Sequence, residues 1–354
     1  MTDFGFTQLP YVLDARKARR STIAVSGDGR MTRGVMLLSR AHDSELDAVA
    51  ALLSRANVPH LRVNADHLHD DEVFLDPATG QVSLNGALMA PTVTWIRHFS
   101  ATAIPRSGHP VADRFSGESW MAAASLLAAM SGVTIAAGRP GVAAQLRLAG
   151  QLGVLVPRTV VTNDLALAGR TIGSRRLVVK AAHQHFVEAE PGLLSGLFPV
   201  VVDRERLNGR TAHGAPVIVQ EYVEHDIELR VYHVGGQLEC FEVSKASPAD
   251  PWLAPDQVTA LLVATPPSVA RDVRRLAAAM SLRFAAFDFL LRDGRSTFLE
   301  ANPDGDWRWL EAKAGQWPVT AAAGRMLSGL HHARCSRSAP FNLLAFLSGD
   351  PPDH

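Results

Sequence analysis

The sequence contains two cysteines, no long hydrophobic run and no excess of charge of either sign. Cys240 and Cys335 are too few for a disulfide framework or a thiolate metal site. The formal net charge is zero, so no overall field favours binding to nucleic acid or to a membrane surface. The longest apolar stretches, such as 121–130, are much shorter than a membrane span, and the first residues lack the pattern of a signal peptide. We therefore expect a cytoplasmic protein that binds neither nucleic acid nor membrane.

The length of 354 residues is too great for one ordinary core and indicates two or three domains of mixed α/β class. A buried strand at 34–39, a helix that begins after the cap residues 42–45 and a strand at 60–63 form a β-α-β unit, which implies a parallel sheet. We expect an irregular segment after Lys180. The other predicted elements are short strands within 73–97, strands at 159–162, 176–180, 216–223, 228–233 and 237–243, and helices at 116–130, 143–152, 270–280 and 320–330.

Two apolar runs near the C-terminus each contain a carboxylate and are joined by the turn signal Arg-Asp-Gly-Arg at 292–295. In the hairpin that this pattern predicts, Asp288 and Glu300 are cross-strand neighbours, and Asn302 shares the face of Glu300 because side chains alternate. Two carboxylates and an amide oxygen form an oxygen-only set suited to Mg²⁺ beside a nucleotide phosphate. A hairpin whose acids point to solvent is the alternative, and these three residues alone leave it open.

Two cations at strand positions are candidates for phosphate and substrate binding. Lys180 ends an apolar strand, where its ammonium can bind ATP phosphates or extend to water. Glu228 and Arg230 share one face of a later strand. The planar guanidinium of Arg230 is suited to hold a carboxylate or an acyl-phosphate with two parallel hydrogen bonds, and an ion pair with Glu228 is its structural alternative.

A strand rich in Val and Ile ends in an acidic segment shortly before Glu228. Backbone groups at such a strand-to-loop hinge can pair with the edge of adenine, and a carboxylate can accept hydrogen bonds from ribose hydroxyls. A half-buried strand edge is the alternative interpretation. The hinge residues are Gln220, Glu221, Tyr222, Val223 and Glu224.

These features follow one order along the chain: a lysine strand, an acidic hinge, an arginine strand and then Asp-x11-Glu-x-Asn. The order, and the spacing from Asp288 to Glu300, resemble those of the ATP-grasp ligases. The run at 145–163 is similar to the domain junction of the ATP-grasp ligases that modify ribosomal peptides, the microviridin-type or graspetide macrocyclases. The run at 300–311 is similar to their C-terminal signature, and the resemblance covers roughly residues 34–332.

The resemblance implies an ATP-grasp fold behind an N-terminal pre-ATP-grasp α/β domain, with ATP and Mg²⁺ as cofactors. We divide the chain into an extension or added edge strand at 1–33, the N-terminal domain at 34–135, a central subdomain at 136–215, a C-terminal subdomain with the metal site at 216–332 and a loose tail at 333–354. The implied site residues are Arg230 and Lys180 for catalysis, Lys180, Gln220, Glu221, Tyr222, Val223, Glu224 and Glu228 for ATP, and Asp288, Glu300 and Asn302 for the metal.

The sequence also departs from the family pattern. Family members usually carry a lysine just before the Gln-Leu of the junction helix, where Ala143 and Ala144 stand here. No glycine-rich phosphate flap follows Lys180. These departures leave nucleotide affinity and the substrate open. His183 and His185 could share one strand face as metal ligands, but the sequence places no third ligand, so we favour surface or substrate contacts.

The implied chemistry is activation of a carboxylate by ATP, followed by attack of an amine or hydroxyl on the acyl-phosphate. Our first hypothesis is a ligase that modifies or macrocyclises a ribosomal precursor peptide. The second is a ligase that joins small amino acids in natural-product biosynthesis, and the third is a nucleotide-binding protein without turnover. The expected partner is accordingly a precursor peptide or a small amino acid, and a homodimer is one assembly to test.

Overall fold

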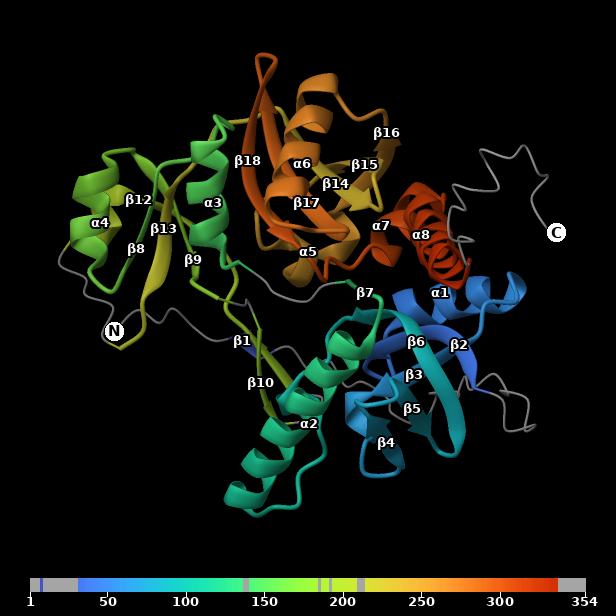
Figure 1. Cartoon of the computed structure of the whole chain (residues 1–354). Coiled ribbons are helices and arrows are strands. Elements are labelled where there is room, and N and C mark those ends of the chain that lie inside the picture. Colours follow the sequence, from blue (N-terminus) through green and yellow to red (C-terminus); the bar gives the residue numbers. More distant parts are fainter. Residues whose placement is uncertain are drawn as a thin grey trace, which may run out of the picture.

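The computed structural model describes residues 7–8, 31–135, 140–183, 186–190, 193–208 and 214–336. Four sheets build this part of the chain. Figure 1 shows the N-terminal elements (blue to cyan), the central elements (green to yellow) and the C-terminal elements (orange to red) as three lobes.

The N-terminal sheet is formed by β2 (Thr32–Ser39), β3 (His60–Asn64), β4 (Val73–Asp76), β5 (Gln81–Leu84), β6 (Ala87–Ile96) and β7 (Val133–Ile135). Its helical elements are α1 (Ser44–Arg55), η2 (Ala65–His67), η3 (Ala101–Ala103) and α2 (Pro110–Met130). The strand order is β3-β2-β6-β5-β4, with β7 paired to β6. Because β2 runs parallel to both β3 and β6, the predicted β-α-β unit is confirmed.

The first helix begins where the sequence predicts. Asp43 is its N-cap, and the Asp43 carboxylate accepts a hydrogen bond from the Leu46 N–H at 3.0 Å. The chain leaves α1 through Asn57, which adopts a positive φ of 53°. Asparagine tolerates this left-handed conformation better than most residues.

The central sheet has four antiparallel strands in the order β12-β9-β13-β8, with α4 packed against β8 and β13. The elements are β8 (Thr159–Thr162), α4 (Leu165–Ile172), β9 (Arg176–Ala181), β12 (Val200–Asp203), η4 (Arg204–Leu207) and β13 (Val217–Glu221). The predicted strands at 159–162, 176–180 and 216–223 are therefore confirmed, with boundaries that differ by at most two residues. The sequence pattern did not predict α4 or β12.

The segment after Lys180 is not irregular, and that prediction was wrong. Strands β10 (Phe186–Glu190) and β11 (Leu193–Gly196) form an antiparallel hairpin, and β1 (Thr7–Gln8) adds to the free edge of β11. The added edge strand predicted within residues 1–33 is thus present at β1. Strand order here comes from pairing between short segments that lack a strong alternating pattern of their own.

The C-terminal sheet is antiparallel, and its strands are β14 (Ile227–Val234), β15 (Gln237–Ser244), β16 (Thr259–Val263), β17 (Phe284–Arg292) and β18 (Arg295–Asn302). Their order is β16-β15-β14-β17-β18. The associated helices are α3 (Val142–Gln151), α5 (Asp250–Leu253), η5 (Pro255–Gln257), α6 (Pro267–Ala279), α7 (Arg308–Ala314) and α8 (Pro318–Cys335). The sequence pattern missed β16 and α7.

The predicted hairpin and the predicted tail have different outcomes. Asp293 and Gly294 both have positive φ, 50° and 74°, as a two-residue type I′ turn requires, so the hairpin is confirmed. The last helix continues to Cys335, so a tail that starts at 333 is placed too early. The remainder of the predicted tail, 337–354, lies outside the described residues.

One aromatic cluster joins the N-terminal and C-terminal sheets. Trp95 of β6 stacks on Trp307 with ring centroids 6.0 Å apart, and Phe284 of β17 contacts both rings at 5.1 and 5.2 Å. All three side chains are fully buried and belong to one core with α1 and α8. Within the described residues, no helix has the length and apolar character needed to cross a membrane.

We expect Trp95→Ala to lower the free energy of unfolding by about 3–5 kcal/mol, because it removes a large buried side chain from the contact between two sheets. Urea denaturation measures the change. Trp317→Ala is the matched control: Trp317 is about half exposed, at 49%, and its loss should cost about 1 kcal/mol or less. Equal effects of the two substitutions would contradict a structural role for the aromatic cluster.

Candidate active site

The predicted hairpin places three oxygen-bearing side chains together. Asp288 on β17 and Glu300 on β18 are register partners, and Asn302 follows two residues later on β18. Gln145 on α3 binds the backbone of Ala301, the residue between Glu300 and Asn302. Its Oε1 accepts from the Ala301 N–H at 2.7 Å, and its Nε2 donates to the Ala301 carbonyl at 2.9 Å. The junction helix therefore fixes the backbone that presents Glu300 and Asn302.

Lys180 connects the central sheet to this hairpin. Its Nζ lies 2.9 Å from Glu300 Oε2, across 120 residues of sequence. The lysine is buried, although it stands near the end of β9. Its ammonium therefore faces Glu300 of the C-terminal sheet and does not extend into bulk water.

Arg230 on β14 is the register partner of Asp288 on β17. Its Nη1 lies 3.1 Å from both carboxylate oxygens of Asp288, and its Nε donates to the Tyr232 hydroxyl at 3.1 Å. That hydroxyl donates in turn to the Asp306 carbonyl at 2.5 Å. Burial raises the pKa of Tyr232, so the hydroxyl remains a donor at neutral pH. Arg230 is thereby oriented from two sides.

Glu228 lies on the same strand and has different partners. Its carboxylate is 2.6 Å from Lys245 Nζ and 3.1 Å from His225 Nε2. Glu228 is thus paired with Lys245 and His225, whereas Arg230 is paired with Asp288. The alternative in which an ion pair with Glu228 holds Arg230 does not apply. Lys245 comes directly after β15 and places a cation beside Glu228. Sequence reasoning did not identify this cation.

The first part of the predicted hinge is held by the central sheet. Gln220 is buried, and its Nε2 donates to Thr159 Oγ1 at 2.9 Å. The Glu221 carboxylate accepts from the Arg158 N–H at 2.8 Å, and the Glu221 N–H donates to the Arg158 carbonyl at 2.9 Å. These contacts fix the end of β13 against the start of its neighbour β8.

The second part of the hinge surrounds one arginine. The Arg176 guanidinium lies 3.8 Å from the centre of the Tyr222 ring, and its Nη1 is 2.8 Å from Glu224 Oε1. The Val223 carbonyl is 2.8 Å from His225 Nδ1. An open pocket of about 190 Å³ begins beside these residues, and its apolar lining includes Leu155, Val223, Leu290 and Leu291.

The donor set fits a hard divalent cation. Burial, and the neighbouring Glu300 carboxylate, raise the pKa of Asp288 although Arg230 opposes the shift, so an added positive charge would favour the ionised form. Among the described residues no three His, Cys, Asp or Glu side chains gather as a metal site. The amide oxygen of Asn302, the third predicted donor, accepts a hydrogen bond from the Asp304 N–H at 3.0 Å. The exposed His183 joins no such cluster, and His185 lies outside the described residues.

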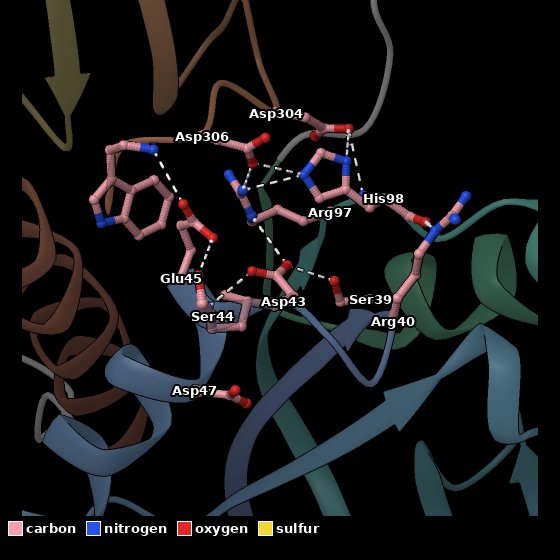
Figure 2. Close-up of polar contacts among 12 residues, drawn as sticks. Ser39, Arg40, Asp43, Ser44, Glu45, Asp47, Arg97, His98, Asp304 and Asp306 are labelled. Atoms are coloured by element: carbon pink, nitrogen blue, oxygen red, sulfur yellow. Dashed lines mark hydrogen bonds and ion pairs between the residues drawn. The ribbon is translucent and has the colours of Figure 1, made fainter. Parts of the chain in front are cut away.

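A buried arginine from the N-terminal sheet holds the loop that follows Asn302 (Figure 2). Arg97, at the end of β6, is completely buried; its Nε is 3.3 Å from Asp43 Oδ2 and its Nη2 is 2.7 Å from Asp306 Oδ1. Its Cζ lies 4.7 Å from the centre of the Trp307 ring. Sequence reasoning did not predict the contact of Arg97 with Asp43 and Asp306. The one feature of the sequence that could have indicated it is an arginine directly after a buried strand.

The rest of the C-terminal signature is structural. Glu45 of α1 accepts from the Trp307 and Arg308 N–H groups at 3.3 and 3.1 Å, where α7 begins. Both oxygens of the buried Glu311 carboxylate accept from Thr320, and Trp307 Nε1 donates to the same Thr320 hydroxyl at 2.9 Å. These contacts hold the loop that carries Asp306.

Comparison of the whole chain with known proteins assigns the fold. No family model matches the chain, and no curated protein matches it by sequence. Solved structures do match. The macrocyclase MdnC of Microcystis aeruginosa, bound with its precursor peptide MdnA, has a TM-score of 0.68 at 18% identity, covering 84% of this chain and 99% of that one. The chain has the ATP-grasp fold.

Two further solved structures match the chain with different degrees of similarity. A RiPP-associated ATP-grasp ligase of Chryseobacterium gregarium, in complex with ADP and a leader and core peptide, matches with a TM-score of 0.68 at 20% identity, over 84% of this chain and 97% of that one. D-alanyl-alanine synthetase A of Vibrio cholerae matches with a TM-score of 0.51 at 14% identity, over 86% and 99%. The peptide-modifying structures are thus the more similar in shape.

Asp306 provides a pH-dependent test of the buried arginine network. Burial alone would raise the pKa of Asp306, but the hydrogen bond from His98 and the positive charges of His98 and Arg97 lower it to about 2. A carboxylate with a lowered pKa stabilises the fold above its unfolded pKa, and this contribution disappears as the pH falls through the folded value. The contribution of Asp306 to the free energy of unfolding is therefore lost between about pH 4 and about pH 2.

We expect Asp306→Asn to be less stable than the wild type by about 1 kcal/mol above pH 4, a value reduced for solvent screening because the carboxylate is 54% exposed. The difference should shrink toward pH 2, where the wild-type carboxylate is protonated. Urea denaturation across this range measures both free energies. A difference that is independent of pH would show that Asp306 contributes through shape and not through charge.

Proposed function

We propose that this chain is an ATP-dependent, ADP-forming ligase that joins a carboxylate to an amine or a hydroxyl of a ribosomal peptide. The observation that carries the proposal is the convergence of Lys180 on Glu300 and of Arg230 on Asp288 in one cleft of an ATP-grasp fold. Acyl transfer through an acyl-phosphate needs a metal-nucleotide site beside a group that holds a carboxylate. These two ion pairs support the assignment of both to neighbouring positions.

Binding of ATP is assigned to the cleft between the central and C-terminal sheets. In this assignment residues 34–135 form the pre-ATP-grasp domain, 136–215 the central subdomain and 216–332 the C-terminal subdomain. Lys180 binds the phosphates, the hinge from Gln220 to Glu224 meets the adenine, and Glu228 meets the ribose. The apolar pocket beside Val223 supports the adenine position. The neighbours in complex with ADP support the choice of nucleotide.

Asp288, Glu300 and Asn302 would hold Mg²⁺, which supplies positive charge to the transferred phosphoryl group when bound. The chain's own cations are placed for the same charge. Lys180 and Arg230 already lie against the two acids, so each can contact an oxygen of the phosphoryl group or the substrate without moving far. Arg230 holds the substrate carboxylate, and its contact with Tyr232 keeps the guanidinium plane fixed.

A peptide is the substrate that the structural neighbours favour. MdnC is a macrocyclase solved with its precursor peptide, and the ligase from Chryseobacterium gregarium was solved with a leader and a core peptide. The lower TM-score of D-alanyl-alanine synthetase A makes a ligase for free amino acids the weaker alternative. We assign a carboxylate of Asp or Glu as the activated group and a side chain of Lys, Ser or Thr as the acceptor.

Mass spectrometry tests the function directly. A library of synthetic peptides that combine Asp or Glu with Lys, Ser or Thr is incubated with the full chain, ATP and Mg²⁺. We expect ADP release together with peptides that have lost one water for each linkage formed. Release of ADP with free amino acids alone would transfer the activity to a small-molecule ligase. ATP binding without ADP formation under any of these conditions would contradict the proposal.

Glu300→Gln tests the metal assignment, because it removes one charge from the set while keeping its shape. We expect turnover to fall by a factor of about 10² or more, the usual scale for loss of one preorganised electrostatic group. ADP formation with the most active library peptide measures the effect. Glu239→Gln is a control at another partly buried glutamate, on β15. Near-normal ADP formation by the Glu300 variant would remove Glu300 from the metal site.

Arg230→Lys tests the carboxylate assignment, since lysine keeps the charge but loses the two-pronged geometry. We expect nearly normal ATP binding, measured as the rise in melting temperature with ATP and Mg²⁺, and product formation at least about tenfold slower. A variant that loses ATP binding while its residual chemistry is normal would instead make Arg230 a structural partner of Asp288.

A further inference from the structure

The carboxyl ends of the parallel strands β2 and β6 face the loop at 303–307, directly after the proposed metal ligand Asn302. Ligands of parallel α/β sheets bind at this edge of the strands. Arg40 follows β2 and His98 follows β6, so both lie at this edge (Figure 2). Arg40 has no part in the site described so far, and His98 enters it only as a partner of Asp306.

The backbone holds His98 in an uncommon conformation. Its φ is +48°, a region that residues other than glycine seldom adopt. Two contacts maintain it: the His98 N–H donates to Asp304 Oδ2 at 3.4 Å, and the His98 carbonyl accepts from Arg40 Nε at 3.0 Å. Conformations of this kind cost free energy and are concentrated at functional sites.

The imidazole ring is oriented by one acid. Its Nε2 is 2.9 Å from Asp306 Oδ1, a hydrogen bond, whereas its Nδ1 is 3.9 Å from Asp304 Oδ2, which is too long for one. Arg97 Nη2 is 3.2 Å from the same Nε2, but it donates to Asp306 Oδ1 at the shorter distance of 2.7 Å. In the neutral ring the proton therefore belongs on Nε2, facing Asp306, and the lone pair belongs on Nδ1. The side chain is 36% exposed, so a substrate group can reach the ring.

The histidine loop is also joined to Arg230. The Asp306 carbonyl accepts from the Tyr232 hydroxyl, which accepts from Arg230 Nε. A Cβ atom added at Gly305 would lie only 3.1 Å from Arg230 Nη2, so the backbone beside Asp306 packs closely on the guanidinium. His98 is thus joined, through Asp306 and Tyr232, to the arginine to which the proposed function assigns the substrate carboxylate.

We propose that His98 is the catalytic base for the acceptor and that Asp306 is its positioning residue; this inference rests on the proposed ligase function. The nitrogen or oxygen of the acceptor attacks the carbonyl carbon of the acyl-phosphate, and a C–N or C–O bond forms. The bond between the carbonyl carbon and the phosphate oxygen breaks, and phosphate leaves with its electron pair. His98 Nδ1 accepts the proton that the acceptor loses.

The charges around the ring suit this role. Asp304 and Asp306 face it from the loop after β18, and Asp43 acts on it from the start of α1. The one cation close to the ring among the described contacts is Arg97, whose Nη2 lies 3.2 Å from Nε2 and is itself paired with Asp306 and so offset by that acid. Once His98 has taken the proton, the surrounding carboxylates stabilise the imidazolium, as the aspartate of a His-Asp pair does in other acyl-transfer enzymes.

The test separates activation of the carboxylate from its transfer. The most active library peptide is incubated with ATP and Mg²⁺, with and without hydroxylamine, which is a nucleophile at neutral pH without help from a base. Hydroxamate reports the acyl-phosphate, and loss of water from the peptide reports transfer to its own acceptor. His98→Asn is the variant of choice, because asparagine tolerates a positive φ.

We expect His98→Asn to form hydroxamate within about twofold of the wild type but crosslinked peptide at least about 10²-fold more slowly. A protonated His98 cannot accept the proton, so the wild-type rate of crosslinking should fall at acid pH. This fall in rate should be absent from the variant. Asp306→Asn should slow crosslinking more than hydroxamate formation. His69→Asn is the matched control, since His69 is another exposed histidine beside an aspartate, 3.3 Å from Asp70, and should leave both rates unchanged.

Three outcomes would overturn the proposal. Unchanged crosslinking by His98→Asn would exclude His98 as the base, and equal loss of hydroxamate and crosslinking would make its role structural. Retention of the acidic fall in the variant would assign the titrating group elsewhere. A wild type that forms neither ADP nor hydroxamate would instead refute the ligase function itself, so the two failures are distinguishable.

Discussion

The side-by-side placement of Asp288 and Glu300 is the constraint on which the site depends. Neighbouring carboxylates repel each other, and partial burial makes each charge more costly than in water. Arg230, on the adjacent strand, and Lys180, from a different sheet, offset that cost. Because Lys180 belongs to the central sheet, the charge balance of the C-terminal hairpin draws the two sheets together. The Lys180–Glu300 ion pair is therefore a contact between the two sheets in addition to the backbone that connects them.

The N-terminal sheet contributes to the same site through a second buried charge. The Arg97 guanidinium has no exposed surface, so it needs acids at close range, and these come from both lobes: Asp43 at the start of α1 and Asp306 in the loop after Asn302. The stacked rings of Trp95 and Trp307 exclude water from this contact. The position of the loop after Asn302 is thus set by the end of a strand more than 200 residues earlier in the chain.

The sequence allowed good prediction wherever a pattern acts over a few residues. The Asp-Gly turn sets the register of the hairpin as far as Phe289, so the hairpin itself followed from residues 287–302 alone. A register shift between Phe289 and Asp288 then makes Glu300, and not Leu299, the partner of Asp288, and the turn does not encode that shift. The cap at Asp43 and the parallel β-α-β unit followed from local periodicity in the same way. By contrast, the hairpin after Lys180 pairs with a segment at 7–8, and no local pattern encodes a partner so distant. Arg97 and its acids escaped prediction for the same reason.

The junction helix illustrates how a departure from a family pattern acquires meaning only in three dimensions. Ala144 stands where the sequence resemblance predicts a lysine, yet its neighbour Gln145 holds the backbone between two proposed metal ligands. The helix therefore positions Ala301 without that lysine. The cations with described ion pairs in the cleft, Lys180, Arg230 and Lys245, all extend from strands or directly follow one. Each faces one acid, so these three pairs are neutral together. Binding of a negatively charged nucleotide then depends on exchanging these internal partners for phosphate oxygens, and a divalent cation that occupies the acids makes that exchange favourable.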